Sequence, residues 1–265
     1  MENIIDHNQR SFLITPLDHR EVIKCRPDHF LYPAVLARIE RDRPAIDAFR
    51  HKIGPFCEHA NLDRLARHAT KPGVPFWGNG YFDGGDARAV YGIIAAHRPA
   101  HIVEIGSGNS TMFMRQAIRD FSLETKITSI DPVPRAEIDA ICDVVVRRSV
   151  LDVELAMFSA LEPNDILFMD GSHLTFNGTD TVRLFLEILP VVAAGVMVHI
   201  HDINLPKEYT RSFDQRGYSE QYMLGAALLF SDELEVLLPV NLLHEQNSFQ
   251  GGVSFWFHKR KRLLP

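Results

Sequence analysis

Two acids and two histidines follow two short apolar stretches in the second half of the chain. Asp170 and His173 come just after Ile166–Met169, and His201 and Asp202 come directly after Val196–Ile200. Short apolar stretches of this kind are typical of buried strands. The carboxyl ends of parallel strands meet at one sheet edge, so we expect these side chains to lie within reach of one another. Two carboxylates and an imidazole can hold a divalent metal ion, which makes Asp170, His201 and Asp202 candidate ligands.

A glycine turn lies earlier, in the segment His101–Thr111, whose sequence is HIVEIGSGNST. It predicts an apolar strand, a tight turn at Gly106 and Gly108, and a helix that begins at Ser110 or Thr111. Glycines allow the backbone to approach a ligand closely, and the first N–H groups of the helix can face that ligand. Glu104 comes at the carboxyl end of the strand, where open α/β sheets bind ligands. The segment therefore predicts a small-molecule site.

Strands and helices alternate from Ile102 onward, and this order predicts a mostly parallel sheet covered on both faces. A loop without a helical pattern, Asn241–Gly252, precedes the last strand, so we expect that strand to be antiparallel. The expected strands are Ile102–Ile105, Lys126–Ile130, Val144–Val146, Ile166–Met169, Val196–Ile200, Glu235–Pro239 and Val253–His258. The expected helices are Ser110–Phe121, Arg135–Ile141, Val153–Ala160, Thr179–Leu189 and Ser219–Phe230.

The residues around the turn restrict the class of ligand that it could bind. A dinucleotide fingerprint requires a third glycine, and Thr111 occupies that position. Its absence counts against a pyrophosphate site. Asp131 ends the second strand, roughly 20 to 25 residues past the turn, where an acid can accept hydrogen bonds from both ribose hydroxyls. The alternative for Asp131 is a turn or capping residue before Pro132.

In these motifs, from about residue 80 to 258, the chain resembles the class I S-adenosylmethionine-dependent methyltransferases. The segment Val103–Thr111 is similar to their first motif, and Asp131 matches their ribose acid. The resemblance implies a three-layer, Rossmann-like α/β fold with a mostly parallel seven-stranded sheet and an antiparallel last strand. It also implies that adenine lies by the third strand end, near Ser149 and Val150, with Asp152 as either a further contact or a helix cap. The implied cofactor-binding residues are Glu104, Gly106, Ser107, Gly108, Ser110, Asp131, Ser149, Val150 and Asp170.

The strand ends also resemble those of metal-dependent small-molecule O-methyltransferases of the catechol, sugar and macrolide types. Asp170 matches their first metal-binding acid, and His201-Asp202 occupies the place of a pair that is normally Asp-Asn or Glu-Asp. His173 falls where the catechol-type enzymes carry a catalytic lysine, which implies a base with an ordinary pKa of about 6.5. Asp170 would orient that base or hold Mg²⁺. The implied activity is methyl transfer to a hydroxyl of a sugar or secondary metabolite.

The amino-terminal third lies outside the resemblance. We expect residues 1–75 to form a helical cap or lid, with helices near Pro33–Arg41, Ala45–His51 and Asn61–His68, and residues 76–265 to form the methyltransferase domain. The aromatic, glycine-rich loop Phe76–Asp86 is either a surface loop or one that closes on a ligand. A helix follows it, from about Ala87 to His97. Tyr209 and Glu220 are candidates for an acceptor pocket, although Glu220 would also suit the positive end of its helix.

The composition excludes several classes of protein. The formal net charge of −6 argues against nucleic-acid binding, so the basic run Lys259–Arg262 is interpreted as a solvated tail. The three cysteines (Cys25, Cys57 and Cys142) have no paired spacing, which favours a reducing compartment. The start, MENIIDHNQR, does not resemble a signal peptide, and no apolar run approaches the ~20 residues of a membrane span. We therefore expect a cytoplasmic protein with a small-molecule acceptor and no membrane partner; homo-oligomerisation stays open.

Two other functions compete with methyl transfer. The run His199-x-His201-Asp202 could belong to a metal-dependent hydrolase, although Asn204 stands near where such enzymes carry another histidine. His199 by itself is better explained as a hydrogen-bonded core residue. The chain could also bind S-adenosylmethionine without turnover. Binding of S-adenosylmethionine, NAD and metals separates these alternatives.

Overall fold

A single mixed sheet forms the centre of the protein. The computed structural model describes residues 26–27 and 30–260. Seven strands lie in the order β3-β2-β1-β4-β5-β7-β6, with β7 antiparallel to both of its neighbours and the other recorded pairs parallel. This is the predicted α/β architecture, including the antiparallel last strand. The strands are β1 His101–Ile105, β2 Lys126–Ile130, β3 Val144–Val146, β4 Ile166–Met169, β5 Met197–Ile200, β6 Leu234–Pro239 and β7 Phe255–Lys259.

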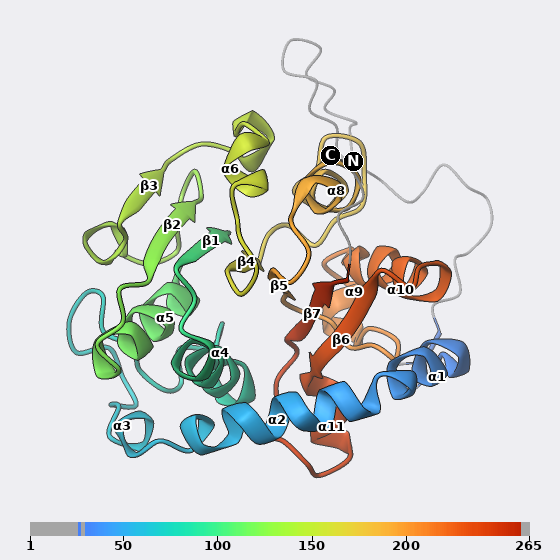
Figure 1. Ribbon diagram of the computed structural model, residues 1–265, viewed down its shortest axis with the longest axis horizontal. Coiled ribbons are helices and arrows are strands. Elements are labelled where there is room, and N and C mark those ends of the chain that lie inside the picture. The colour runs from blue at the N-terminus through green and yellow to red at the C-terminus, as the bar shows by residue number, and fades with distance from the viewer. Residues whose placement is uncertain (1–25, 28–29, 261–265) are drawn as a thin grey trace.

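Helices cover both faces of this sheet. In Figure 1, α2, α4 and α5 lie together on one side of the strands, and α6 and α8 lie on the other. The described helices are α1 Pro33–Arg41, α2 Arg43–Cys57, α3 Ala60–Asp63, α4 Gly84–His97, α5 Asn109–Asp120, α6 Ala156–Ser159, α7 Asp180–Arg183, α8 Leu189–Val191, α9 Arg211–Asp214, α10 Glu220–Phe230 and α11 Val240–Glu245. A π-helical turn, Leu184–Ile188, joins α7 to α8.

The central strands are apolar on both faces because both faces are covered. Every residue of β4 and β5 is buried, whereas the edge strand β3 leaves Val144 and Val145 partly exposed. The continuous apolar runs that predicted these strands therefore reflect packing between two helical layers. Because β1 pairs with β2 and β4, and β4 pairs with β5, the carboxyl ends of these four strands lie next to one another.

The amino-terminal helices pack against the same core. The α2 helix contacts α4 and β6, and α1 contacts α10 (Figure 1). The approach of α2 to α4 is close at Gly92, where a Cβ would lie 2.5 Å from Sγ of Cys57. Of the helices predicted in residues 1–75, Pro33–Arg41 is α1 and Ala45–His51 lies within α2, whereas the helix predicted over Asn61–His68 ends at Asp63, the last residue of α3. Residues 1–25 and 28–29 lie outside the described part. Whether residues 1–75 act as a lid stays a prediction.

Several local predictions differ from the structure. The helix predicted over Arg135–Ile141 is absent, and only Asp139–Ile141 forms a short 3-10 turn. The loop Asn241–Gly252, predicted to lack a helix, is overlapped at its start by α11. Cys57 and Cys142 are free thiols, whereas Cys25 lies outside the described residues. The solvated-tail interpretation of the basic run is wrong for its first residue: Lys259 is buried in β7 and its Nζ donates to the carbonyl oxygen of Val192 at 2.8 Å, and the next residue, Arg260, pairs with Glu235. Lys261 and Arg262 lie outside the described residues.

Among the helices of the described residues, none combines the length and apolar character needed to cross a membrane.

Candidate active site

The glycine turn is fastened to the ends of β1 and β4. Gly106 has φ +77°, and a Cβ there would lie 1.8 Å from the backbone oxygen of Asp170. Only glycine fits, because the positive φ and the close contact both exclude a side chain. The turn consequently lies directly against the residue that ends β4.

Hydrogen bonds to Glu104 stabilise the glycine turn. The carboxylate of Glu104 accepts hydrogen bonds from the hydroxyls of Ser110 at 2.6 Å and Thr111 at 2.5 Å. Thr111 also accepts the N–H of Gly108 at 3.0 Å. Burial raises the pKa of the fully buried Glu104 from its ordinary 4.5 to about 7, although the hydroxyls of Ser110 and Thr111 oppose the rise. At the position of the missing third glycine, Thr111 thus closes the turn with its hydroxyl.

A pocket of about 450 Å³ lies over the turn and the strand ends. Its lining includes Asp131, Ser149 and Val150 from the ends of β2 and β3, and also Tyr81, Phe82 and Asp170. Its volume is within the range of small-molecule sites. The predicted cofactor-binding residues along its wall are Gly106, Ser107, Gly108, Ser110, Asp131, Ser149, Val150 and Asp170. Glu104 lies beneath the wall, and no described residue before Tyr81 contributes to it.

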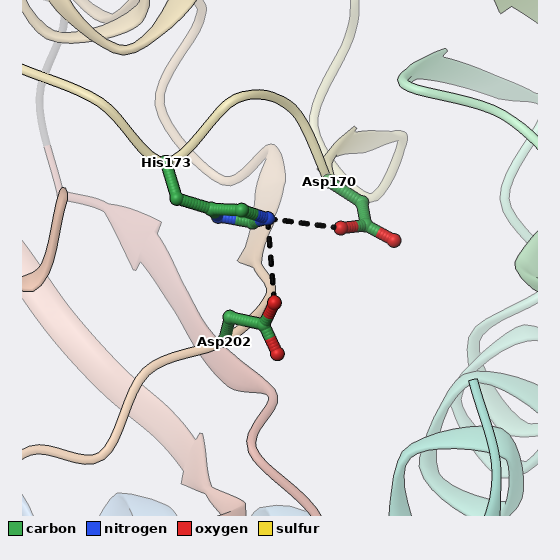
Figure 2. A group of neighbouring side chains, drawn as sticks. All are labelled: Asp170, His173 and Asp202. Carbon is green, nitrogen blue, oxygen red and sulfur yellow. Dashed lines mark ion pairs between the residues drawn. The ribbon is translucent and has the colours of Figure 1, made fainter. Parts of the chain in front are cut away.

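Asp170 also belongs to a group of side chains behind the pocket. Figure 2 shows the His173 ring with Nε2 directed at both Asp170 and Asp202. Nε2 lies 3.3 Å from Oδ1 of Asp170 and 3.4 Å from Oδ2 of Asp202. The three side chains each offer a ligand atom, and these atoms lie within 4.8 Å of one another. The predicted convergence of the β4 and β5 ends is therefore present.

His201 lies on the other side of the same acids. Its Nδ1 is 3.5 Å from Asp170 and 3.4 Å from Asp202. Its Nε2 is 3.3 Å from Oδ2 of Asp86, at the start of α4. Asp86 in turn accepts the N–H groups of Val253 and Ser254. The contact of Asp86 with His201 was not predicted from the sequence. The only sequence feature that could have suggested it is the position of this acid at the end of the aromatic, glycine-rich loop.

The electrostatics of the group are dominated by carboxylates. The ion pairs recorded for Asp170, Asp202 and Glu220 in the described chain are all with imidazoles. Burial alone would lower the pKa of His173, but hydrogen bonds to Asp170 and Glu220 raise it to about 10. Burial would likewise raise the pKa of Asp170, but the two histidines hold it well below its usual range. In this arrangement His173 and His201 carry protons that balance part of the acidic charge.

Three other residues that the sequence suggested for the site are fully buried. His199 is fully buried, stacks on Phe168 with ring centroids 3.7 Å apart, and pairs with Ser254 through Nε2 at 2.9 Å. Tyr209 and Glu220, proposed from sequence for an acceptor pocket, are both fully buried. The Tyr209 hydroxyl accepts the N–H of Gln221, and Glu220 lies behind His173.

A family model matches the central part of the chain. Residues 103–203 match the family model described as a methyltransferase domain. The match spans the glycine turn, Asp131, Asp170 and Asp202, and with the sheet order it confirms the predicted resemblance: the fold is that of a class I S-adenosylmethionine-dependent methyltransferase.

Two solved structures are similar to the chain. One is the SAH-bound methyltransferase PaMTH1 of Podospora anserina, with 15% identity, 88% of this chain and 91% of that chain covered, and a TM-score of 0.41. The other, from Thermobifida fusca YX, is described as a candidate methyltransferase, with 14% identity, 86% and 93% coverage, and a TM-score of 0.37. No curated protein matches the chain.

Proposed function

We propose that this protein transfers a methyl group from S-adenosylmethionine to a hydroxyl of a small molecule, with a divalent metal ion that binds the acceptor. The observation that carries this proposal is the double role of Asp170. It lines the pocket over the glycine turn, and it is also a member of the Asp170–His173–Asp202 group. A donor in that pocket and an acceptor at that group would meet at Asp170.

The pocket wall suits the donor. Asp131 would accept the ribose hydroxyls, and Ser149 and Val150 would border the adenine. The backbone of Gly106–Gly108 would pass the methionine part, so the sulfonium would lie toward Asp170, whose carboxylate favours a cation. Holding the methyl group in line with the acceptor oxygen is the main task of such a protein, because the sulfonium already activates the methyl group.

The donor set behind the pocket fits a metal ion. Asp170, His173 and Asp202 would supply two carboxylate oxygens and one imidazole nitrogen, a mixed set that suits Mn²⁺ better than the Mg²⁺ expected from sequence. A bound metal ion would lower the pKa of the acceptor hydroxyl. His201, predicted as a ligand, would orient both acids through Nδ1 while Asp86 holds its Nε2.

His173 is better suited to ligation than to the base role expected from sequence. Two carboxylates face Nε2, and Glu220 faces Nδ1 at 2.9 Å. These acids keep protons on both nitrogens, and an imidazolium cannot accept another proton. A metal ion would replace the proton on Nε2.

The test is methyl transfer from radiolabelled S-adenosylmethionine to a panel of catechols and sugars. The protein is treated with EDTA and then supplied with Mn²⁺. We expect activity that requires the metal, and a loss of at least 100-fold in Asp170→Asn. The control is Asp139→Asn. Asp139 lies on an exposed turn and its carboxylate pairs with Arg147, so this variant should retain activity. Donor binding without transfer to any hydroxyl would favour the non-catalytic alternative, and metal binding without donor binding would favour the hydrolase.

A further inference from the structure

The start of α10 holds the backbone of His173. His173 has φ +60°, which non-glycine residues adopt uncommonly. Its carbonyl oxygen accepts the N–H of Ser219 at 2.8 Å and the N–H of Glu220 at 3.2 Å. Two residues further on, the N–H of Thr175 donates to the Ser219 hydroxyl at 2.9 Å. These bonds stabilise the uncommon backbone conformation and fix the position from which the imidazole projects.

Two side chains from the same segment fix the ring. The Tyr218 ring packs on the His173 ring with centroids 4.5 Å apart. Oε2 of Glu220 lies 2.9 Å from Nδ1. With one face covered and Nδ1 occupied, Nε2 is directed toward Asp170 and Asp202, as Figure 2 shows.

The burial of Glu220 is costly for a role in folding alone. The residue is fully buried, and His173 is its recorded side-chain partner; Oε1 has no hydrogen-bond partner among the described residues. A glutamate that served only the positive end of the helix could remain in water. A buried carboxylate needs a compensating partner, and here that partner is the imidazole nitrogen opposite the candidate metal-facing atom.

We propose that Glu220 is a positioning residue for the metal site: it holds a proton on Nδ1 of His173 and so presents the Nε2 lone pair to a cation between Asp170 and Asp202. The inference rests on the proposed function for the metal. A carboxylate on the far nitrogen fixes both the tautomer and the ring orientation of a ligating histidine. Loss of such a partner typically weakens metal binding by about 10- to 100-fold.

The first test measures Mn²⁺ and S-adenosylhomocysteine binding by calorimetry. We expect Glu220→Gln to weaken Mn²⁺ binding by roughly 10- to 100-fold while leaving S-adenosylhomocysteine binding unchanged. The matched control is Glu208→Gln, which removes another buried carboxylate beside α10 that pairs with Tyr222 instead of His173. Wild-type Mn²⁺ affinity in Glu220→Gln, or equal loss of both ligands, overturns the positioning role.

A second measurement works without metal binding or activity. In wild-type protein, nitrogen-15 NMR of the histidine rings should show a slowly exchanging Nδ1 proton on His173, and this proton should exchange faster in Glu220→Gln, because a neutral amide oxygen accepts a weaker hydrogen bond than a carboxylate. If wild-type protein binds no Mn²⁺ but shows this proton, the metal part of the proposed function fails and the positioning contact stands. If wild-type His173 lacks the proton, the inference itself fails.

Discussion

Oδ2 of Asp131 accepts a hydrogen bond from the backbone N–H of Ser107 at 2.8 Å. The acid at the end of β2 is therefore bonded to the glycine turn that follows β1. Its other oxygen, Oδ1, accepts the N–H of Val133 at 2.8 Å. Asp131 can therefore stabilise the turn before Pro132 and still accept hydrogen bonds from a ribose, because a carboxylate oxygen can accept more than one hydrogen bond.

We expect Asp131→Ala to weaken S-adenosylhomocysteine binding by roughly 10- to 100-fold, since a hydrogen bond to a charged group contributes about 1.5–3 kcal/mol. Asp131→Asn should lose less, because its amide oxygen still accepts. Calorimetric titration measures both. Unaltered affinity in Asp131→Ala would remove the ribose role, and a rise in melting temperature with NAD alone would argue for a dinucleotide site.

Gly106→Ala should destabilise the protein by more than about 1 kcal/mol and abolish donor binding, because a Cβ meets the backbone of Asp170 at 1.8 Å. Gly80→Ala is the matched control: Gly80 also has a positive φ, +76°, but a Cβ on this residue would have nothing within 4 Å. Urea unfolding compares the two variants. Equal losses would mean that φ strain, and not the contact with Asp170, makes Gly106 necessary.

The sheet and the meeting of Asp170 with Asp202 were predictable because parallel strands bring their carboxyl ends to one edge. Strand identity came from apolar runs, which the two helical layers explain. The glycine turn at Gly106 was also predictable from local sequence, whereas Ser149 and Val150 were expected in the pocket wall only from the resemblance to methyltransferases. Local sequence was therefore sufficient to predict the strands that are buried between the two helical layers.

Contacts between distant segments were not predictable. Glu220 and Asp86 reach His173 and His201 from α10 and α4, and no spacing links either pair. The α2 helix continues through Gly54 and Pro55, which locally disfavour a helix, because Ile53 and Cys57 are buried beside Gly92. The α11 helix was missed because its 6 residues are too few to establish a period.

The last prediction concerns Glu104. Its pKa is raised from 4.5 to about 7 in the folded protein, so the folded state binds more protons than the unfolded state between these pH values. Stability from this group is fully present below pH 4.5 and falls as the pH rises to about 7. The difference between the two pKa values corresponds to roughly 3 kcal/mol.

The Glu104→Gln variant has no ionisable group at this position. Its free energy of unfolding should therefore not show the decrease that Glu104 causes between pH 4.5 and about 7, while the other groups titrate as in the wild type. The measurement is urea unfolding of both proteins at several pH values between about 4.5 and 7.5, with the difference between the two curves taken at each pH. Glu124→Gln, at an exposed glutamate in the loop before β2, is the control and should follow the wild type throughout. A constant difference between Glu104→Gln and wild type would mean that Glu104 ionises as easily inside the protein as outside, and that its hydroxyl partners offset its burial.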